Sequence, residues 1–211
     1  MNDGVEIRRE LKPGDLGAII ALHGRLIPPE YGLDSTHEGY IAASVAEHAT
    51  RGWPGERESA WIVERDGELV GNIALTDDGE GRGGLRWFAL EPSLRGRGLG
   101  RWLVGEVVAE ARAHGYRELY LETFSDLRAA GHLYREYGFR IVHEETGPRW
   151  GREQVTYQHY ELELRGEGSG NGSDGTRTRG LRRDRSTQGG GSEGPFPPFP
   201  SEMVQLPPPF S

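Results

Sequence analysis

The first fifty residues carry apolar positions at helical spacing. Pro13 opens this pattern, and Pro28-Pro29 is expected to end the helix, because proline removes the N–H that an interior turn requires. One face of this helix would hold Leu16, Ile19, Ile20, His23 and Ile27. A second helix is predicted over Thr36 to Thr50. Two consecutive helices therefore precede any strand of the central region.

Strand patterns follow. Ala60 to Glu64 and Leu69 to Leu75 flank Asp66-Gly67, a dipeptide that suits the positive φ angles of a two-residue hairpin turn. Leu85 to Leu90 is predicted as a further strand that stops before Pro92. Strict alternation would place Leu85, Trp87 and Ala89 on one face of it, opposite Arg86, Phe88 and Leu90.

The second half alternates helices and strands. An amphipathic helix runs from Leu99 to His114-Gly115, and a shorter one, capped by Ser125 or Asp126, ends at Gly138. Strands are predicted over Glu118 to Thr123, Phe139 to His143 and Val155 to Leu164. The element order β-α-α-β-β-β-α-β-α-β-β predicts an α+β fold with a mixed, mostly antiparallel sheet of about six or seven strands and about four helices.

Composition divides the 211 residues into two parts. Residues 166–211 hold ten of the 33 glycines and seven of the 13 prolines, a composition that cannot bury a core. We therefore expect one domain over residues 1–165 and a disordered Gly/Pro/Arg-rich tail over 166–211. The stretch from Asp174 to Arg185 resembles translation through a transfer-RNA gene, which favours run-on translation, and a basic arm that binds RNA is the alternative interpretation.

Several classes of protein are excluded by what the chain lacks. Without cysteine, disulfide scaffolds and thiolate metal sites cannot form, and seven histidines without paired spacing predict no metal site. No apolar run could cross a membrane and the first residues are acidic, so we expect a cytoplasmic protein without a membrane partner. The formal charge of −8 argues against nucleic-acid partners and favours cationic small molecules.

A glycine-rich turn carries the candidate chemistry. Arg95-Gly96-Arg97-Gly98-Leu99-Gly100-Arg101 lies between a predicted strand and a long helix, where backbone N–H groups and the helix N-terminus can hold a phosphate or pyrophosphate. The spacing does not fit the P-loop of nucleotide triphosphatases, and it fits the dinucleotide fingerprint poorly. An anionic cofactor is implied.

This turn resembles motif A of the GNAT superfamily of acyl-CoA-dependent N-acetyltransferases. A second segment, from Ala130 to Phe139, is similar to the family's Ala-x-x-Leu-Tyr-x-x-x-Gly-Phe signature, and Leu90-Glu91-Pro92 is similar to the end of its fourth strand. The likeness covers roughly Val5 to Leu164. Tyr31-Gly32-Leu33-Asp34 and the layout resemble the acetyltransferase domain fused to MarR-type regulators, although this sequence shows no such DNA-binding domain.

The resemblance implies acetyl-CoA as co-substrate and the GNAT fold. The cofactor would be bound by Ala89, Leu90, Arg95, Gly96, Arg97, Gly98, Leu99, Gly100, Arg101 and Tyr134. The backbone N–H of Leu90 would polarise the thioester carbonyl, and Tyr134 would act as general acid toward the sulfur. Leu127 departs from the asparagine that many relatives carry there, so one cofactor hydrogen bond is missing or is supplied elsewhere.

The acceptor would be an amine on a small molecule or peptide, attacking the thioester directly in a ternary complex. Glu91 leads as general base, with Glu122, Glu30, Asp77, Asp78 and water-mediated deprotonation as alternatives. Glu30 and Tyr31 would form the acceptor wall; His23 is either a core residue or an acceptor-site residue. The resemblance to the family also makes a homodimer a candidate assembly. The alternative functions are a catalytically weak acyl-CoA sensor and an RNA-associated protein that acts through its tail.

The composition generates a first testable prediction. Deleting residues 166–211 should leave the melting temperature and CoA affinity unchanged, because this segment offers little apolar surface to bury. Thermal unfolding of the full chain and the truncated chain checks this. A large drop in Tm on truncation would contradict it.

Overall fold

A computed structural model describes residues 4–164 of the chain. The predictions for the tail, including the basic arm and the possible run-on translation, lie outside these residues. The seven strands are β1 (Val5–Arg8), β2 (Ser59–Arg65), β3 (Glu68–Asp77), β4 (Arg82–Leu90), β5 (Glu118–Phe124), β6 (Arg140–Arg149) and β7 (Arg152–Glu163). The helices are α1 (Asp15–Tyr31), α2 (Thr36–Thr50), α3 (Leu99–Ala113) and α4 (Arg128–Glu136), with a short 3-10 turn at Pro92–Leu94.

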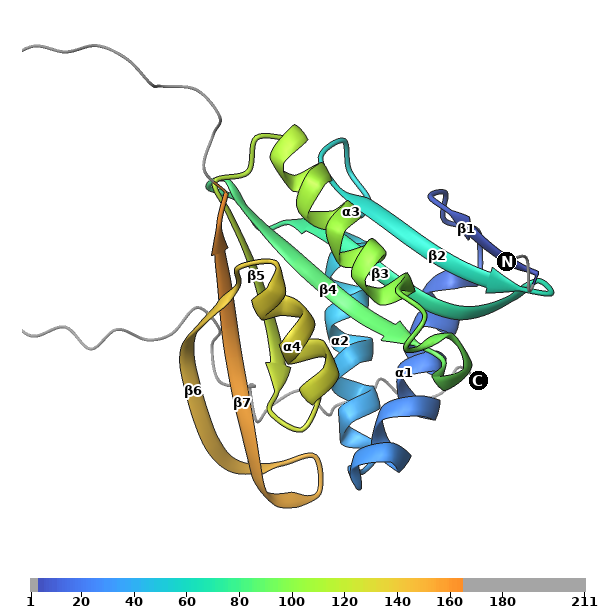
Figure 1. Ribbon diagram of the computed structural model, residues 1–211. Helices are drawn as coiled ribbons and strands as arrows, with labels where there is room; N and C mark the ends of the chain where they lie inside the picture. Colours follow the sequence, from blue (N-terminus) through green and yellow to red (C-terminus); the bar gives the residue numbers. More distant parts are fainter. Residues whose placement is uncertain (1–3, 165–211) are drawn as a thin grey trace, which may run out of the picture. The chain divides into compact units, whose positions relative to one another are not determined.

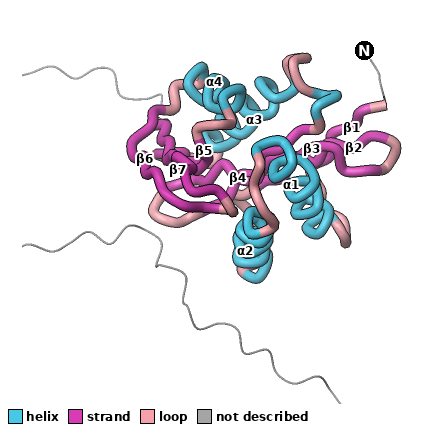
Figure 2. The backbone as a smooth tube through the Cα atoms, turned by 90° about the horizontal axis from the view of Figure 1, so that it is seen from below, coloured by secondary structure: helices cyan, strands magenta, loops and turns pink. Residues whose placement is uncertain are grey.

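The strands form one mixed sheet in the order β1-β2-β3-β4-β5-β7-β6, in which every neighbouring pair is antiparallel except β4 and β5. Helices α3 and α4 cover one face of the sheet, and α1 and α2 cover the other, as the view along the sheet in Figure 2 shows. The predicted α+β class, the mixed sheet and the number of elements are confirmed.

Two apolar layers fix the helices on the sheet. On one face, Leu103, Val104 and Val107 of α3 pack on Leu85 and Leu121 of the sheet. On the other face, α1 and α2 pack on the sheet through a cluster of buried residues, Ile19, Ile41, Val45, Ala60, Ile62, Ala74 and Trp87. Burying each large apolar side chain contributes about 1.5–3 kcal/mol, so both layers hold the helices firmly.

The turn between β2 and β3 and the C-terminal ends of α3 and α4, predicted from local sequence signals, are confirmed. Asp66 and Gly67 both have positive φ, 54° and 80°, which confirms the predicted tight turn between β2 and β3. Helix α3 ends at Ala113 and is followed by Gly115 with φ 73°, and Gly138 follows α4 with φ 92°. Glycine therefore terminates both helices as the sequence indicated.

The end of α1 was predicted wrongly. The helix continues through Pro28 and Pro29 to Tyr31 and stops at Gly32, which has φ 65°. The N–H groups of Gly32 and Leu33 both donate to the Pro28 carbonyl. Proline removes a donor but keeps its acceptor, so these two prolines fit the last turn, and glycine closes it.

The alternation predicted for β4 is also wrong. Trp87 has φ 47° and lies at an irregularity in the β3–β4 pairing, where Asn72 donates a hydrogen bond to its carbonyl oxygen. This bulge inserts one residue, so Trp87 packs with α1 and α2, whereas Leu85 packs with α3. Leu85 and Trp87 therefore lie on opposite faces of the sheet.

Other boundaries also differ from the prediction. Strand β4 begins at Arg82, and β6 extends to Arg149, because each is paired along its length by a neighbouring strand. Helix α4 has Leu127 as N-cap without a side-chain hydrogen bond, so neither Ser125 nor Asp126 caps it. The Asp126 carboxylate instead pairs with Arg152, and the Ser125 N–H donates to the Thr156 carbonyl.

The two parallel strands separate in the middle of the sheet. β4 and β5 pair only from Arg82 to Gly84 with Glu118 to Tyr120. Beyond that point β4 stays with β3 and β5 stays with β7, so the strands diverge, as Figure 1 shows. The sheet is therefore open between β4 and β5 beyond Gly84 and Tyr120.

A substitution at Gly71 tests how closely β3 packs against the end of β4. A Cβ at Gly71 would lie 2.5 Å from Leu90 Cδ2, 3.1 Å from the Ala89 carbonyl oxygen and 3.3 Å from Val63 Cβ. Gly71→Ala should therefore destabilise the protein by about 1–3 kcal/mol, the usual cost of overpacking. Urea unfolding measures this. The matched control is Gly147→Ala in β6, where a Cβ meets nothing within 4 Å; equal stability of the two variants would contradict the argument.

Candidate active site

A cavity of about 430 Å³ occupies the gap between the diverging strands. Its walls include Leu90 of β4, Glu122 of β5, the glycine turn before α3 and residues of α1, α2 and α4. Because the gap opens the sheet, residues from both faces line the same cavity. One end is formed by the glycine turn and α4, and the other by α1, α2 and the β6–β7 turn.

The glycine turn has the geometry of an anion site. Gly96 and Gly98 have φ of 73° and 85°, and a Cβ at either position would meet no protein atom within 4 Å. Gly98 is the N-cap of α3 and makes no side-chain capping hydrogen bond. The first N–H groups of a helix have no partner within the helix, so these backbone donors are available to a ligand.

Most of the residues predicted to bind the cofactor line this cavity. They are Ala89, Leu90, Arg95, Gly96, Gly98, Gly100, Arg101 and Tyr134. Arg97 and Leu99 belong to the same turn but are not among the lining residues. Arg95 donates to the Leu90 carbonyl at 2.9 Å and forms an ion pair with Glu30 at 2.8 Å, and Arg101 forms one with Glu136 at 2.9 Å.

The backbone of Leu90 points into the gap. The Glu91 N–H donates to the Val70 carbonyl of β3 at 2.9 Å. Successive N–H groups of a strand point to opposite edges, so the Leu90 N–H points away from β3. The Leu90 carbonyl agrees with this direction, since it accepts from Arg95 at the cavity.

Tyr134 lies on α4 with its ring buried against Phe139 and Tyr160. Its side chain lines the cavity, and among the described residues its hydroxyl makes no side-chain hydrogen bond. Burial, with a smaller contribution from Tyr160, raises the pKa of Tyr134 well above its usual value. The hydroxyl is therefore protonated at neutral pH and can donate a hydrogen bond.

Only some of the remaining predicted site residues line the cavity. Glu91 forms ion pairs with Arg25 at 3.0 Å and Arg65 at 2.8 Å and does not line the cavity. Glu30 is also outside the lining, although its carboxylate accepts from Arg95 and from the Tyr31 hydroxyl. Tyr31 itself lines the cavity. Of the five carboxylates considered as general base, the cavity lining includes only Glu122.

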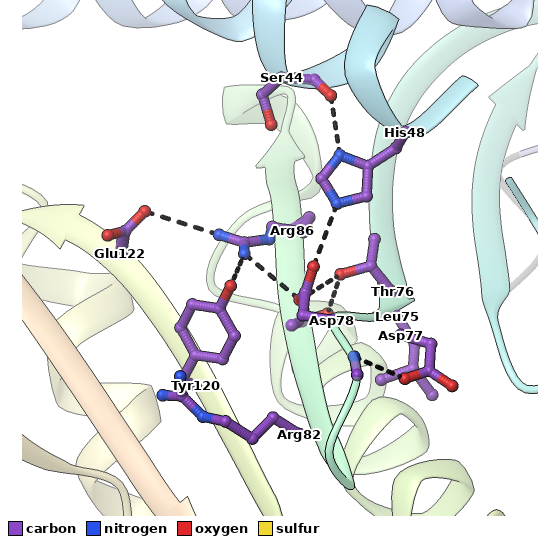
Figure 3. Close-up of polar contacts among 12 residues, drawn as sticks. Ser44, His48, Leu75, Thr76, Asp77, Asp78, Arg82, Arg86, Tyr120 and Glu122 are labelled. Atoms are coloured by element: carbon purple, nitrogen blue, oxygen red, sulfur yellow. Dashed lines mark hydrogen bonds and ion pairs between the residues drawn. The ribbon is translucent and has the colours of Figure 1, made fainter. Parts of the chain in front are cut away.

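Glu122 is held by a buried charge network, drawn in Figure 3. Arg86 lies 3.6 Å from the Glu122 carboxylate and 3.4 Å from Asp78, and it donates to the Tyr120 hydroxyl. Asp78 accepts from Thr76 at 3.0 Å and lies 3.5 Å from His48 Nε2. One guanidinium thus joins the loop after β3 to a carboxylate in the cavity.

This network keeps both carboxylates ionised. Burial alone would raise the pKa of Glu122, but His159 and Arg86 together hold that pKa below its usual value. At Asp78, burial is likewise outweighed by His48 and Arg86, so the pKa of Asp78 is also lowered. Glu122 therefore carries a negative charge at neutral pH inside a mostly apolar cavity.

The acceptor end contains residues that sequence reasoning missed. The cavity is lined there by His37 and Tyr40 of α2, Phe124 of β5, Trp150 of the β6–β7 turn and Tyr157 of β7. His37 and Tyr40 are one helical turn apart, so their shared face was visible in the sequence. The approach of the β6–β7 turn to α2 depends on long-range pairing and carried no local signal. His23, for which a core role and an acceptor-site role were both considered, is buried and also lines the cavity.

Known acetyltransferases are similar in sequence to this chain. The chain is 29% identical over 126 residues to the uncharacterised N-acetyltransferase YjgM of Escherichia coli, covering 58% of this chain and 75% of that protein. The next two curated relatives are matched over only 46% and 22% of their lengths.

Solved structures share the fold. A GNAT family acetyltransferase of Streptococcus pneumoniae superposes with a TM-score of 0.57 at 20% identity, covering 76% of this chain and 99% of that one. The protein yncA of Salmonella typhimurium, solved with acetyl-CoA, gives a TM-score of 0.57 at 18% identity, covering 79% and 98%. At such identities the likeness establishes the fold alone.

The seven-stranded sheet that opens between β4 and β5 has the GNAT fold. The sequence pattern of the acetyltransferase (GNAT) family matches residues 26–139, more than half of the chain, and the chain belongs to that family. The more particular likeness to acetyltransferases fused to MarR-type regulators stays a prediction. Within residues 4–164, no helix is long and apolar enough to span a membrane.

Removing Arg86 should destabilise the protein in a pH-dependent way. In Arg86→Gln, two buried carboxylates lose their cation, which should cost about 3 kcal/mol at pH 7. The lowered pKa values of Asp78 and Glu122 stabilise the wild type above about pH 4 and lose that contribution as pH falls. In the variant, protonation relieves the unpaired charges, so the difference should shrink from pH 7 to pH 4.

Urea unfolding at both pH values measures this difference. The control is Arg51→Gln, because Arg51 is 46% exposed and lies 3.9 Å from the same Asp78, so its loss should cost less than about 1 kcal/mol. A cost for Arg86→Gln that is equal at the two pH values would contradict the argument.

Proposed function

We propose that this protein transfers the acetyl group of acetyl-CoA to an amine by direct attack in a ternary complex. The observation that carries the proposal is the cavity through the opened sheet, with the glycine turn at one end and an ionised carboxylate at the other. Such a cavity allows two substrates to approach each other from opposite faces of the sheet.

The glycine turn fits the pyrophosphate of CoA. The uncapped N-terminus of α3 supplies backbone N–H donors, and Arg95 and Arg101 supply positive charge beside them. The Leu90 N–H then faces the gap, where it would donate to the thioester carbonyl oxygen. Acetyl-CoA contributes the activated acyl group, and the chain supplies its position and the polarisation of its carbonyl. Leu127 lines this cavity where many relatives carry asparagine, so these backbone donors take a larger share of the binding.

We assign Glu122 as the residue that binds the amine and takes up its proton. An alkylammonium ion with a pKa near 10.4 costs about 4–5 kcal/mol to deprotonate at pH 7. Glu122 binds the ammonium and accepts or relays its proton, because it is the one general-base candidate that lines the cavity. This assignment replaces Glu91, whose carboxylate is engaged by Arg25 and Arg65.

Tyr134 acts at the departing sulfur. As the amine nitrogen bonds to the acyl carbon and the carbon–sulfur bond breaks, the hydroxyl of Tyr134 donates its hydrogen to the thiolate. The proton lost by the amine leaves by way of Glu122 to solvent, and solvent restores the proton on Tyr134. The raised pKa keeps this hydroxyl protonated over the working pH range.

Release of free CoA thiol tests the proposal directly. The full chain contains no cysteine, so a thiol reagent reports only the product. We expect amine-dependent release, with initial-rate lines that intersect, as a ternary complex requires. Tyr134→Phe should lower kcat by about a hundredfold or more with little change in acetyl-CoA affinity.

Tyr116→Phe is the control, because Tyr116 is a buried tyrosine that does not line the cavity. If Tyr134→Phe released thiol at the wild-type rate, Tyr134 would be a core residue. If acetyl-CoA bound but no amine produced thiol, the sensor interpretation would be favoured. Failure of acetyl-CoA to bind would overturn the proposed function.

A further inference from the structure

Six aromatic side chains surround the acceptor end of the cavity. This aromatic cluster consists of Tyr31, His37, Tyr40, Phe124, Trp150 and Tyr157, all of which line the cavity. Trp150 is its centre, because its ring lies 4.9 Å from His37, 5.5 Å from Tyr40, 5.6 Å from Phe124 and 6.3 Å from Tyr157. These are centroid distances typical of packed aromatic rings.

The aromatic cluster is held rigidly. Trp150 is 8% exposed, and its carbonyl accepts the Asp34 N–H at 2.9 Å, which ties the β6–β7 turn to the segment between α1 and α2. The hydroxyls of Tyr40 and Tyr157 lie 2.8 Å apart. The cavity therefore has preformed aromatic walls, which cost little to order when a ligand binds.

In the part of the chain that the structure describes, the lining of the acceptor end contains one charged side chain, the carboxylate of Glu122. Among the described residues that line the cavity, the carboxylates are Glu122 and Glu136, and Glu136 is paired with Arg101 at the glycine turn. The lining arginines, Arg95 and Arg101, both belong to that turn. Arg86 lies beside Glu122, and Arg149 lies over the rings of Tyr157 and Trp150, at 4.5 and 5.7 Å from their centroids, but neither arginine is a lining residue. A ligand at the acceptor end thus meets one anion and no lining arginine or lysine.

Two buried histidines complete the walls without adding charge. His23 and His37 are each 5% exposed and line the cavity, and His23 Nε2 and His37 Nδ1 have no hydrogen-bond partner. Burial lowers the pKa of both to about 4, with His23 contributing to the shift at His37. Both rings are neutral at pH 7, so they do not repel a cation, and each can bond to a polar group of a ligand.

From these walls we infer that the acceptor is a monoamine whose single ammonium group is carried on an aromatic or similarly apolar body. Glu122 binds the ammonium, and the aromatic cluster covers the body and the cation through cation–π contact. The inference rests on the proposed function, since it names the substrate class of the same site.

Other amines fit this end poorly. A polyamine or an aminoglycoside would bring additional ammonium groups to a wall with one carboxylate, where they would lose hydration without a partner. A free amino acid would bring a carboxylate into a space that already holds Glu122 and has no lining cation. Selectivity therefore comes from both attraction and exclusion.

The test uses the full chain and four amines: 2-phenylethylamine, ethylamine, spermidine and phenylalanine. Thiol release should give kcat/KM for 2-phenylethylamine at least about tenfold above each of the other three. Calorimetry without acetyl-CoA should show that 2-phenylethylamine binds more tightly than the uncharged 2-phenylethanol. A separate titration with acetyl-CoA tests the proposed function independently of the amine result.

Two variants test which residues produce the preference for an aromatic amine. Glu122→Gln should remove the preference for the amine over the alcohol in binding, a readout that does not depend on turnover. Trp150→Leu should weaken 2-phenylethylamine binding by about tenfold and leave acetyl-CoA affinity unchanged. Phe124→Leu serves the same purpose if Trp150→Leu does not fold.

The inference is overturned if spermidine, ethylamine or phenylalanine is bound or acetylated as well as 2-phenylethylamine. It is equally overturned if none of the four amines binds, or if Glu122→Gln keeps the full preference for the amine. In each of these cases, binding of acetyl-CoA together with thiol release from any other amine would leave the proposed acetyl transfer standing. Loss of acetyl-CoA binding, with 2-phenylethylamine still bound selectively, would refute the proposed function instead.

Discussion

The separation of β4 from β5 is the constraint on which the other features depend. A strand edge in the interior of a sheet carries backbone N–H and C=O groups that need partners, and leaving them buried and unpaired is costly. Here the pairing stops after Gly84 and Tyr120, and the gap is bordered by a glycine turn and by polar side chains. The bulge at Trp87 lets β4 bend away while it keeps its pairing with β3.

The buried charges can be understood from this opening. Once β5 turns away from β4, its side chains on the α2 face no longer pack against a neighbouring parallel strand. Glu122 occupies that space, and Arg86 reaches it from β4 and connects it to Asp78. Burying several charges is favourable only as a connected set, because each one would otherwise lose its hydration without compensation. The network and the cavity are therefore parts of one arrangement.

Most of the fold could be predicted from local signals, because these signals are strong here. Asp66-Gly67 specifies its turn, the stripe from Leu99 specifies α3, and glycines end the helices. The glycine turn and Tyr134 could be predicted because their motifs are continuous in sequence. Their presence in one cavity agrees with that prediction, whereas their chemical roles stay predictions.

The errors arose where long-range contacts decide the outcome. The shifted register at Trp87 depends on pairing with β3, and α1 passes two prolines because Gly32 supplies the terminating conformation. Trp150 meets His37 only after β6, β7 and α2 have been placed, so no spacing in the sequence reveals the contact. The carboxylate of Glu91 pairs with Arg25 and Arg65, which are distant in sequence, so no local signal showed that Glu91 lies outside the cavity lining.

The ion pair between Arg95 and Glu30 changes how strongly this turn can hold an anion. Arg95 already has a carboxylate partner 2.8 Å away, so an incoming phosphate exchanges one partner for another. The guanidinium then contributes only the difference between two partly exposed ion pairs, which is small. The amides at the start of α3 have no competing cap and contribute their whole interaction. Affinity at this turn consequently resides mainly in the main chain, where replacing side chains cannot remove it.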